Sequence, residues 1–259
     1  MTDPALHVEK FSMSLGGRQI LRDISFSVRA GERVAIIGPN GAGKTTLLKC
    51  LNRILRGGSG QILVGGRPLD SYRQVDLARR LAYVPQAEAR TAPFTVRESV
   101  EMARYPHLGP LAPVRPEDLA AVDRALDAAG MVPLSDRSLD TLSGGERQKA
   151  LLAAALAQEA DILLLDEPTA FLDPSQQTEM LATLGRVHRE RGTTLLSVTH
   201  DLNEAVAHST RVIALREGAV VFDGPADALA QGDALRRIYQ HEFVIGAHPR
   251  TGRPVLFAE

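Results

Sequence analysis

The chain has 259 residues, and 30 Lys and Arg against 31 Asp and Glu give a formal net charge of −1, without the basic excess typical of nucleic-acid binding. This length allows one large domain or two modest domains with a substantial buried core. No apolar run approaches the roughly 18 to 20 residues that cross a bilayer, no signal peptide is evident, and the single Cys50 excludes an internal disulfide, so we expect a cytosolic chain without a transmembrane segment.

The N-terminal region predicts β-strands at Leu6–Met13 and Ile20–Val28, with Gly16-Gly17 as the turn between them. Val34–Ile37 is wholly apolar, which suits a central parallel strand covered on both faces. Cys50 follows on an apolar helix and is expected to be a small core residue.

A phosphate-binding loop follows the apolar strand. Gly38-Pro39-Asn40-Gly41-Ala42-Gly43-Lys44-Thr45 has the G-x-x-x-x-G-K-[ST] form, in which glycines let backbone N–H groups turn onto phosphate oxygens. Lys44 adds a positive charge near the β- and γ-phosphates, and Thr46 extends the binding segment. The leucines after Lys44 fall on one helical face, which completes the required strand–loop–helix context. They are Leu47, Leu48, Leu51 and Leu55.

The middle of the chain changes character between about Gln86 and Gln158. After a predicted strand at Gln61–Val64, prolines mark a loop-rich segment, and alanine- and leucine-rich helices follow at Pro116–Ala129 and from Ser143 onward. The prolines are Pro93, Pro106, Pro110, Pro113 and Pro116. We interpret this region as a helical subdomain inserted into an α/β core.

The core resumes with alternating strands and helices, which predicts a largely parallel sheet. The expected elements are a strand at Ile162–Leu165, a helix at Ser175–Arg191, a strand at Thr194–Thr199, and a hairpin of Arg211–Leu215 with Ala219–Phe222. We expect the core at 1–86 and 159–232, the helical subdomain at 87–158, and a C-terminal extension at 233–259 that begins with a short helix.

Two carboxylates, Asp166 and Glu167, follow the apolar run Ile162–Leu165. Open α/β sheets place ligands at the carboxyl ends of their strands. An Asp-Glu pair in this position is often only a surface feature, but a phosphate loop in the same chain favours a catalytic role. Asp166 is then suited to hold Mg²⁺ with the Thr45 hydroxyl, and Glu167 to orient the attacking water.

The stretch Leu142-Ser143-Gly144-Gly145-Glu146-Arg147-Gln148 resembles the signature of the ATP-binding cassette (ABC) family. The resemblance implies an α/β fold: a P-loop NTPase core with an N-terminal antiparallel β subdomain and an inserted α-helical subdomain. It also implies ATP and Mg²⁺ as cofactors and a homodimer. In that dimer, Ser143, Gly144 and Gly145 would reach the γ-phosphate of ATP held by the other subunit, aided by a helix N-terminus.

Other family motifs appear in the family's order. Gln86, in Val84-Pro85-Gln86, resembles the glutamine that contacts Mg²⁺ or the lytic water, and Asp173, in Phe171-Leu172-Asp173, resembles a residue that crosses the dimer interface. His200 resembles the switch histidine that contacts the γ-phosphate. By this resemblance the catalytic residues are Lys44, Gln86, Glu167 and His200, and the ligands of Mg²⁺ are Thr45, Gln86 and Asp166. A lone Gln or His would be weak support, but the combined order and spacing are specific.

The position of the family's adenine-stacking aromatic residue is occupied by Leu15, while Phe11 is expected in the core. We therefore predict apolar packing against the base and weaker nucleotide affinity, since aromatic contacts add about 0.5–1.5 kcal/mol beyond area burial.

Within the family, three stretches resemble ATPase subunits of importers for iron–siderophore complexes, haem and cobalamin. They are Phe94–Leu108, Asp166–Asp173 and the ending His248–Pro254. This resemblance implies a separate transmembrane permease, met near Gln86 and Pro93–Tyr105, a substrate-binding protein, and a peripheral location on the cytoplasmic face of the membrane. Alternatives are an exporter ATPase for lipids or polysaccharides, and a soluble non-transport ATPase.

Overall fold

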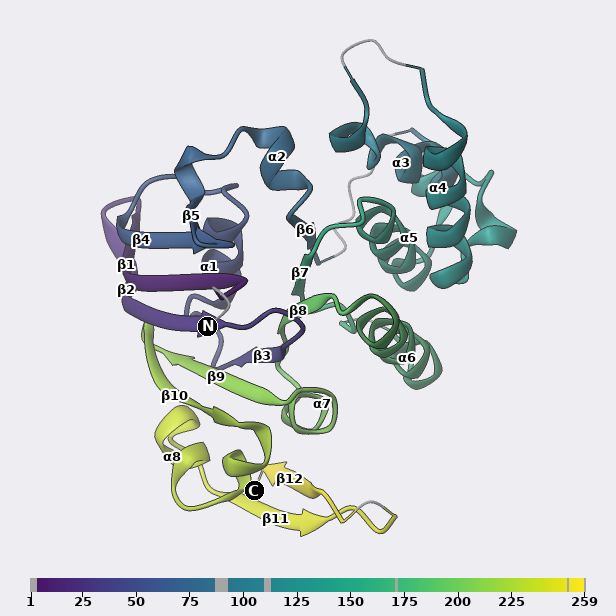
Figure 1. Ribbon diagram of the computed structural model, residues 1–259. Coiled ribbons are helices and arrows are strands. Elements are labelled where there is room, and N and C mark those ends of the chain that lie inside the picture. Colours follow the sequence, from purple (N-terminus) through teal and green to yellow (C-terminus); the bar gives the residue numbers. More distant parts are fainter. Residues whose placement is uncertain (1–3, 87–92, 110–112, 171, 251, 259) are drawn as a thin grey trace. The chain divides into compact units, whose positions relative to one another are not determined.

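The computed structural model describes residues 4–86, 93–109, 113–170, 172–250 and 252–258. The chain forms two compact units (Figure 1). Unit 1 consists of residues 1–71 and 194–259, and unit 2 consists of residues 72–193.

Unit 1 contains an antiparallel sheet at its N-terminal side, as the resemblance implied. Its strands are β1 (Leu6–Leu15), β2 (Arg18–Val28), β4 (Ser59–Val64) and β5 (Arg67–Pro68), in the order β2-β1-β4-β5. Gly16 and Gly17 form the predicted turn, with φ of 55° and 79° that favour glycine. Phe11 is buried, as expected of a core residue.

The second sheet of unit 1 is mostly parallel and carries the phosphate loop. Its strands are β3 (Arg33–Ile37), β8 (Thr194–Val198), β9 (Arg211–Arg216) and β10 (Ala219–Pro225), in the order β10-β9-β3-β8. β3 pairs in parallel with β8 and with β9, and β9 and β10 form the predicted hairpin. Val34–Ile37 is fully buried, which confirms the predicted central strand.

Helices and a terminal hairpin complete unit 1. The helices are α1 (Lys44–Leu51), α7 (Leu202–His208) and α8 (Ala234–Tyr239), with the 3-10 turns η1 (Leu69–Ser71) and η5 (Ala226–Ala230). Strands β11 (Phe243–Ala247) and β12 (Pro254–Ala258) pair with each other. α7, α8 and β12 share one apolar core with β3 and β9. The short helix expected in the C-terminal extension is α8, but the hairpin after it was not predicted.

The helix after the phosphate loop is shorter than the leucine pattern predicted. α1 ends at Leu51, and Leu55 lies beyond it. Arg53 adopts a left-handed φ of 57°, and the N–H groups of Ile54 and Leu55 both donate to the carbonyl of Lys49. This closing geometry satisfies the last carbonyls and ends the helix. Cys50 is a buried core residue as expected, and burial raises the pKa of its thiol to about 11.

Unit 2 combines two strands with helices. β6 (Leu81–Val84) and β7 (Ile162–Asp166) pair in parallel. The helices are α2 (Gln74–Ala78), α3 (Val96–Met102), α4 (Pro116–Ala128), α5 (Gly144–Ala157) and α6 (Pro174–Arg191), and the 3-10 turns are η2 (Tyr105–His107), η3 (Val132–Leu134) and η4 (Leu139–Thr141). The helices α3, α4 and α5 pack against one another.

In its described residues, the segment interpreted as loop-rich contains an α-helix, α3. Thr95 caps it by accepting from the Glu98 N–H, and the Glu98 carboxylate accepts from the Thr95 N–H. This capping box satisfies two N–H groups at the helix start and outweighs the nearby prolines. Within the described ranges, no helix is long and apolar enough to span a membrane.

Candidate active site

The phosphate loop of unit 1 runs from the end of β3 to the start of α1, and two of its glycines combine a positive φ with too little room for a Cβ. Gly38 has φ of 141°, and a Cβ there would lie 2.0 Å from the Leu215 carbonyl oxygen. Gly43, the N-cap of α1, has φ of 97°, and its Cβ would lie 2.8 Å from Leu21 Cδ2. The loop therefore fits closely between β2 and β9, with a backbone that only glycine adopts readily.

Lys44 is the buried cation of this loop, with 7% of its surface exposed. Its Nζ donates to the carbonyl oxygens of Gly38, at 2.7 Å, and Pro39, at 3.1 Å. The ammonium group thus lies over the loop, where the sequence motif predicts phosphate oxygens. Thr45 is exposed and Thr46 half-buried.

The predicted switch residue His200 follows the end of β8, next to the strand that enters the phosphate loop. Val198 of β8 pairs with Ile36 of β3, so both strands end at the same edge of the parallel sheet. His200 is exposed, and Asp201 caps α7 by accepting from the N–H groups of Asn203 and Glu204. Unit 1 thus brings His200 and the phosphate loop to one sheet edge, where open α/β sheets bind ligands.

Leu15 is the last residue of β1, just before the turn to β2, and is 37% exposed. An exposed apolar side chain at the end of a strand is available to an adenine ring.

Unit 2 brings Gln86, Asp166 and Glu167 together at the carboxyl ends of its two strands. Gln86 follows β6, and its Nε2 donates to Glu167 Oε2 at 3.3 Å. Asp166 ends β7, is 3% exposed, and accepts from the Tyr83 hydroxyl at 3.0 Å. The role of Tyr83 as a partner of Asp166 was not predicted from the sequence. Its position near the end of β6, three residues before Gln86, could have suggested it.

Glu167 adopts a left-handed backbone conformation with φ of 49°. Such a conformation is uncommon in a residue other than glycine and costs of order 1–3 kcal/mol, and it persists at functional sites where the surroundings enforce it. Asp166 is buried in the strand, while Glu167 is half-buried after the backbone turns. The two carboxylates therefore have different environments.

The signature stretch begins helix α5. Ser143 is the N-cap and exchanges hydrogen bonds with Glu146, whose pKa is lowered by the Ser143 backbone N–H, by the hydroxyl and, to a lesser degree, by nearby Arg137 and Lys149. A Cβ at Gly144 would contact nothing within 4 Å, whereas one at Gly145 would lie 2.4 Å from Gln176 Oε1. A side chain at Gly145 would thus displace the end of the Gln176 side chain inside unit 2, whereas the start of the helix is open at Gly144.

Two further contacts arrange the predicted motifs of unit 2. Gln148 of α5 donates to the Pro85 carbonyl at 3.3 Å, next to Gln86. Asp173 is exposed and caps α6 by accepting from the Gln176 N–H at 2.9 Å. Phe171, beside it in the predicted motif, lies outside the described residues.

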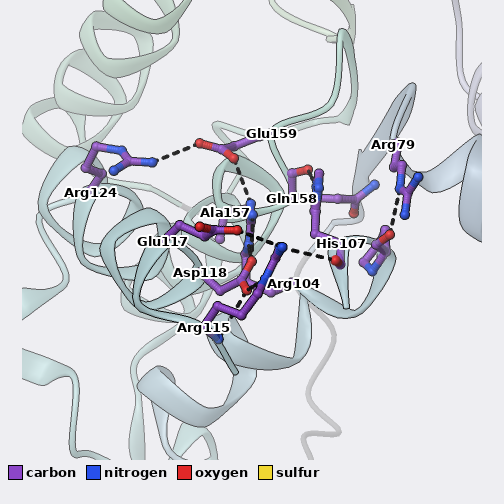
Figure 2. A network of polar contacts seen from close by, with 11 residues as sticks. Arg79, Arg104, His107, Arg115, Glu117, Asp118, Arg124, Ala157, Gln158 and Glu159 are labelled. Carbon is purple, nitrogen blue, oxygen red and sulfur yellow. Dashed lines mark hydrogen bonds and ion pairs between the residues drawn. The ribbon is translucent and has the colours of Figure 1, made fainter. Parts of the chain in front are cut away.

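A buried polar network in unit 2 involves residues of the importer-like stretch (Figure 2). Arg104 donates to Asp118 from Nε and Nη2, and from Nη1 to Glu159 and to the Ala157 carbonyl. His107 contacts the Gln158 carbonyl at 2.8 Å. These contacts fix the turn η2 against α4 and the end of α5, while Tyr105 in the same turn is 67% exposed.

The residues predicted to bind Mg²⁺ offer a carboxylate, a hydroxyl and a side-chain amide, which are the hard oxygen donors this ion prefers. Across the described residues, no group of three or more His, Cys, Asp or Glu side chains gathers into a metal cage. This donor set fits Mg²⁺, which is usually bound by one or two carboxylates together with substrate phosphates and water.

Comparison with known proteins identifies relatives over nearly the whole length. A family model described as ABC transporter matches residues 21–170. The iron(3+)-hydroxamate import ATP-binding protein FhuC of Bacillus subtilis is 38% identical over 251 residues, covering 97% of this chain and 93% of that protein. The hemin import ATP-binding protein HmuV of Nocardia farcinica is 42% identical over 251 residues, covering 97% and 86%.

Among solved structures, an inward-facing structure described as a metal-chelate type ABC transporter has a chain that aligns with a TM-score of 0.83. The two chains are 26% identical, and the alignment covers 99% of each. The family match spans more than half of the chain, and the relatives match it almost from end to end. This chain therefore belongs to the ABC transporter family and is an ATP-binding cassette ATPase.

Proposed function

We propose that this chain is the ATP-hydrolysing subunit of an importer that takes up a metal chelate, such as an iron–siderophore complex, haem or cobalamin. The observation that carries the proposal is the match to two import ATP-binding proteins over 97% of the chain. The motif residues of both units support the same function.

ATP binds at the phosphate loop in this proposal. Backbone N–H groups of residues 40–46 surround the phosphates, and Lys44 exchanges its contacts with the Gly38 and Pro39 carbonyls for contacts with phosphate oxygens. Leu15 packs against the adenine base. The close fit of Gly38 and Gly43 supports this role, because a preformed loop binds phosphate without first being ordered.

Hydrolysis depends on Glu167, assisted by Gln86 and His200. The Gln86 amide nitrogen contacts Glu167, which leaves the Gln86 carbonyl oxygen as its ligand atom for Mg²⁺, alongside Asp166 and Thr45. When bound, Mg²⁺ would neutralise part of the negative charge on the phosphates. Glu167 orients and polarises the attacking water, and His200 contacts the γ-phosphate. Catalysis then rests on positioning and electrostatic stabilisation, since little covalent chemistry is left to the protein.

A second copy of the chain completes the site. Ser143, Gly144 and Gly145 of one copy close over ATP held by the other, and Asp173 lies at the interface. The open space around Gly144 and the exposure of Asp173 support this arrangement. The N-terminus of α5 also provides N–H groups and a dipole that favour an anion.

The permease is a separate protein, and we propose that it binds unit 2 near Gln86 and the segment 93–105. Exposed apolar side chains in this segment support the proposal, because such side chains are typical of protein interfaces. They are Phe94, Met102 and Tyr105. The chain would then be held peripherally at the cytoplasmic face of the membrane, and a substrate-binding protein would deliver the chelate to the permease.

Co-purification from the native host in mild detergent tests this function. We expect a permease with many transmembrane segments, together with a substrate-binding protein, to be recovered with the tagged chain and identified by mass spectrometry. Tyr105→Asp should reduce recovery of the permease, because it places a charge in the apolar interface. Leu119→Asp, which alters an exposed apolar residue of α4, serves as the matched control.

A permease recovered without a binding protein would contradict import and indicate export. Ribosomal or DNA-repair proteins in place of a permease would contradict a transport function.

A further inference from the structure

The first residue of the phosphate loop is held by hydrogen bonds at both its N–H and its carbonyl group. The Gly38 N–H donates to the Tyr239 hydroxyl at 3.2 Å, and the Gly38 carbonyl accepts from Lys44 Nζ at 2.7 Å. Tyr239 is the last residue of α8, in the C-terminal extension, 201 positions further along the chain. The extension therefore contacts the predicted phosphate-binding loop directly.

The hydroxyl meets the backbone where strand pairing ends. β3 pairs with β9 as far as Ile37 and Ala214, and Gly38 then turns against the Leu215 carbonyl. A backbone N–H that leaves a sheet ladder needs another acceptor, because an unpaired buried donor is costly. Tyr239 supplies this acceptor and is itself held by an edge-on contact with Phe243 at 5.7 Å between ring centroids.

A second contact joins the extension to the helix that follows the switch histidine. The Asn203 side chain in α7 accepts from the Leu256 N–H at 2.8 Å and donates to the Leu256 carbonyl at 3.1 Å. Arg253 donates to the Ala207 carbonyl near the end of the same helix. These bonds fix α7 against the terminal hairpin. Asn203, which makes two of them, lies three residues after His200.

Both contacts rest on a common apolar core. Leu235 and Ile238 of α8 and Leu256 of β12 pack with Ala205 and Val206 of α7 against β3 and β9. Because packed interiors resist small displacements, the position of the extension restricts where the loop and α7 can lie.

We propose that the C-terminal extension positions the ATP site of unit 1, with Tyr239 fixing the phosphate loop and Asn203 fixing the helix after His200 through β12. Both act as positioning residues, without contacting ATP. The inference rests on the proposed function, since it takes the loop and His200 as the ATP-contacting groups.

Two variants of the full-length chain test the proposal through ATP affinity, turnover rate and hydrogen exchange. In Tyr239→Phe, the ATP-free loop loses one hydrogen bond and must be ordered on binding. We expect ATP to bind about fivefold more weakly in titration calorimetry, the equivalent of one typical hydrogen bond. The turnover rate at saturating ATP should stay within about twofold, because bound phosphate restores the loop.

Asn203→Ala should change the turnover rate and leave the ATP affinity unchanged, the reverse of Tyr239→Phe. We expect ATP affinity to remain near the wild-type value, while the turnover rate at saturating ATP falls about fivefold, because the helix after His200 loses two hydrogen bonds. Tyr72→Phe, which removes a phenol hydroxyl in unit 2, is the matched control for Tyr239→Phe.

Hydrogen exchange of the ATP-free proteins gives a readout independent of activity. Tyr239→Phe should accelerate exchange in the peptide 34–44, and Asn203→Ala in the peptide 202–208, with β1 and β2 unchanged. Wild-type exchange and affinity in Tyr239→Phe would overturn the proposal. Faster exchange throughout unit 1 would also overturn it, since that would indicate a general loss of stability.

Lys44→Ala distinguishes a failure of the proposed function from a failure of the positioning role. If Lys44→Ala loses ATP binding while Tyr239→Phe behaves as wild type, the proposed function stands and the positioning role is wrong. If Lys44→Ala retains ATP binding, the proposed site fails, and the exchange data alone decide whether the extension orders the loop.

Discussion

At the scale of single residues, the surroundings of Asp166 and Glu167 support different proposed roles for two neighbouring carboxylates. Asp166 is buried at the end of β7 and held by Tyr83, which suits a fixed metal ligand. Glu167 follows in a left-handed backbone conformation and contacts the Gln86 side chain, which suits a group that orients water. The turn of the backbone between them supports the proposed division, with Asp166 as the metal ligand and Glu167 as the residue that orients water.

Leu15→Tyr tests the proposed adenine contact. Leu15 is partly exposed at the end of β1, so a tyrosine ring can be placed there without entering the core. A stacked ring adds about 0.5–1.5 kcal/mol, which corresponds to about 2- to 12-fold tighter ATP binding in titration calorimetry. Leu15→Met, which is apolar but has no ring, should bind ATP as the wild type does. Unchanged affinity in Leu15→Tyr would show that the base binds elsewhere.

Residues in contiguous motifs could be predicted from the sequence, because a phosphate loop or a helix cap is built from neighbours in the chain. Lys44, Asp166 and Glu167 are of this kind. Tyr239 and Asn203 could not be predicted, since their partners lie 201 and 53 positions away and a lone Tyr or Asn gives no local pattern.

At the scale of elements, the turn η2 shows why the importer-like stretch contains Arg104 and His107. Arg104 is 4% exposed and uses all three of its nitrogens, while His107 contacts the end of α5 (Figure 2). Arg79 adds a bond to the Pro106 carbonyl at 2.7 Å. The polar residues of this stretch thus hold the turn in place, and the exposed Tyr105 is presented in a fixed position.

Arg104→Ala should destabilise unit 2 strongly. Removing one partner of a buried ion pair leaves Asp118 buried without full compensation, which typically costs about 3–5 kcal/mol. Arg124→Ala, which breaks a more exposed pair with Glu159, should cost less than about 1 kcal/mol. Urea unfolding at neutral pH measures both, and equal losses in the two variants would contradict a structural role for the buried pair.

Acid unfolding provides the second check of the same network. Arg115 and then Arg104 lower the pKa of Asp118 from 3.8 to about 2. A carboxyl group with a lowered pKa in the folded state stabilises the protein above its ordinary pKa. This contribution is lost as the pH falls from 3.8 to about 2. Asp118→Asn should lack this part of the pH dependence, and an acid transition identical to the wild type would contradict the assignment.

Helices and strands were predictable where their apolar residues follow a regular spacing. The apolar run of β3 and the amphipathic α4 follow directly from their sequences. The hairpin of β11 and β12 was missed because Val244 and Ile245 are adjacent and both exposed, which breaks the alternation of a half-buried strand. Helix α3 carried a usable signal in Thr95 and Glu98, which the surrounding prolines obscured.

At the scale of the whole molecule, the predicted ATP-site residues are divided between the two compact units. Unit 1 contains the phosphate loop and His200, and unit 2 contains Gln86, Asp166, Glu167 and the signature. The fold class was predictable because the motifs occur in a fixed order along the chain, and membership of the ABC family confirms it.

The most direct measurement of the central claim is the mass of the Glu167→Gln variant in solution with ATP and Mg²⁺, by light scattering after size exclusion. The amide keeps the shape of the side chain but removes the charge that polarises water, so ATP should bind without being hydrolysed. We predict a stable dimer with ATP and a monomer without it, and phosphate release far below the wild-type rate. Ser143→Arg in the same background should remain monomeric, because in the proposed dimer the signature faces ATP on the other subunit. Rapid hydrolysis by Glu167→Gln, or a monomer at saturating ATP, would contradict the proposed site.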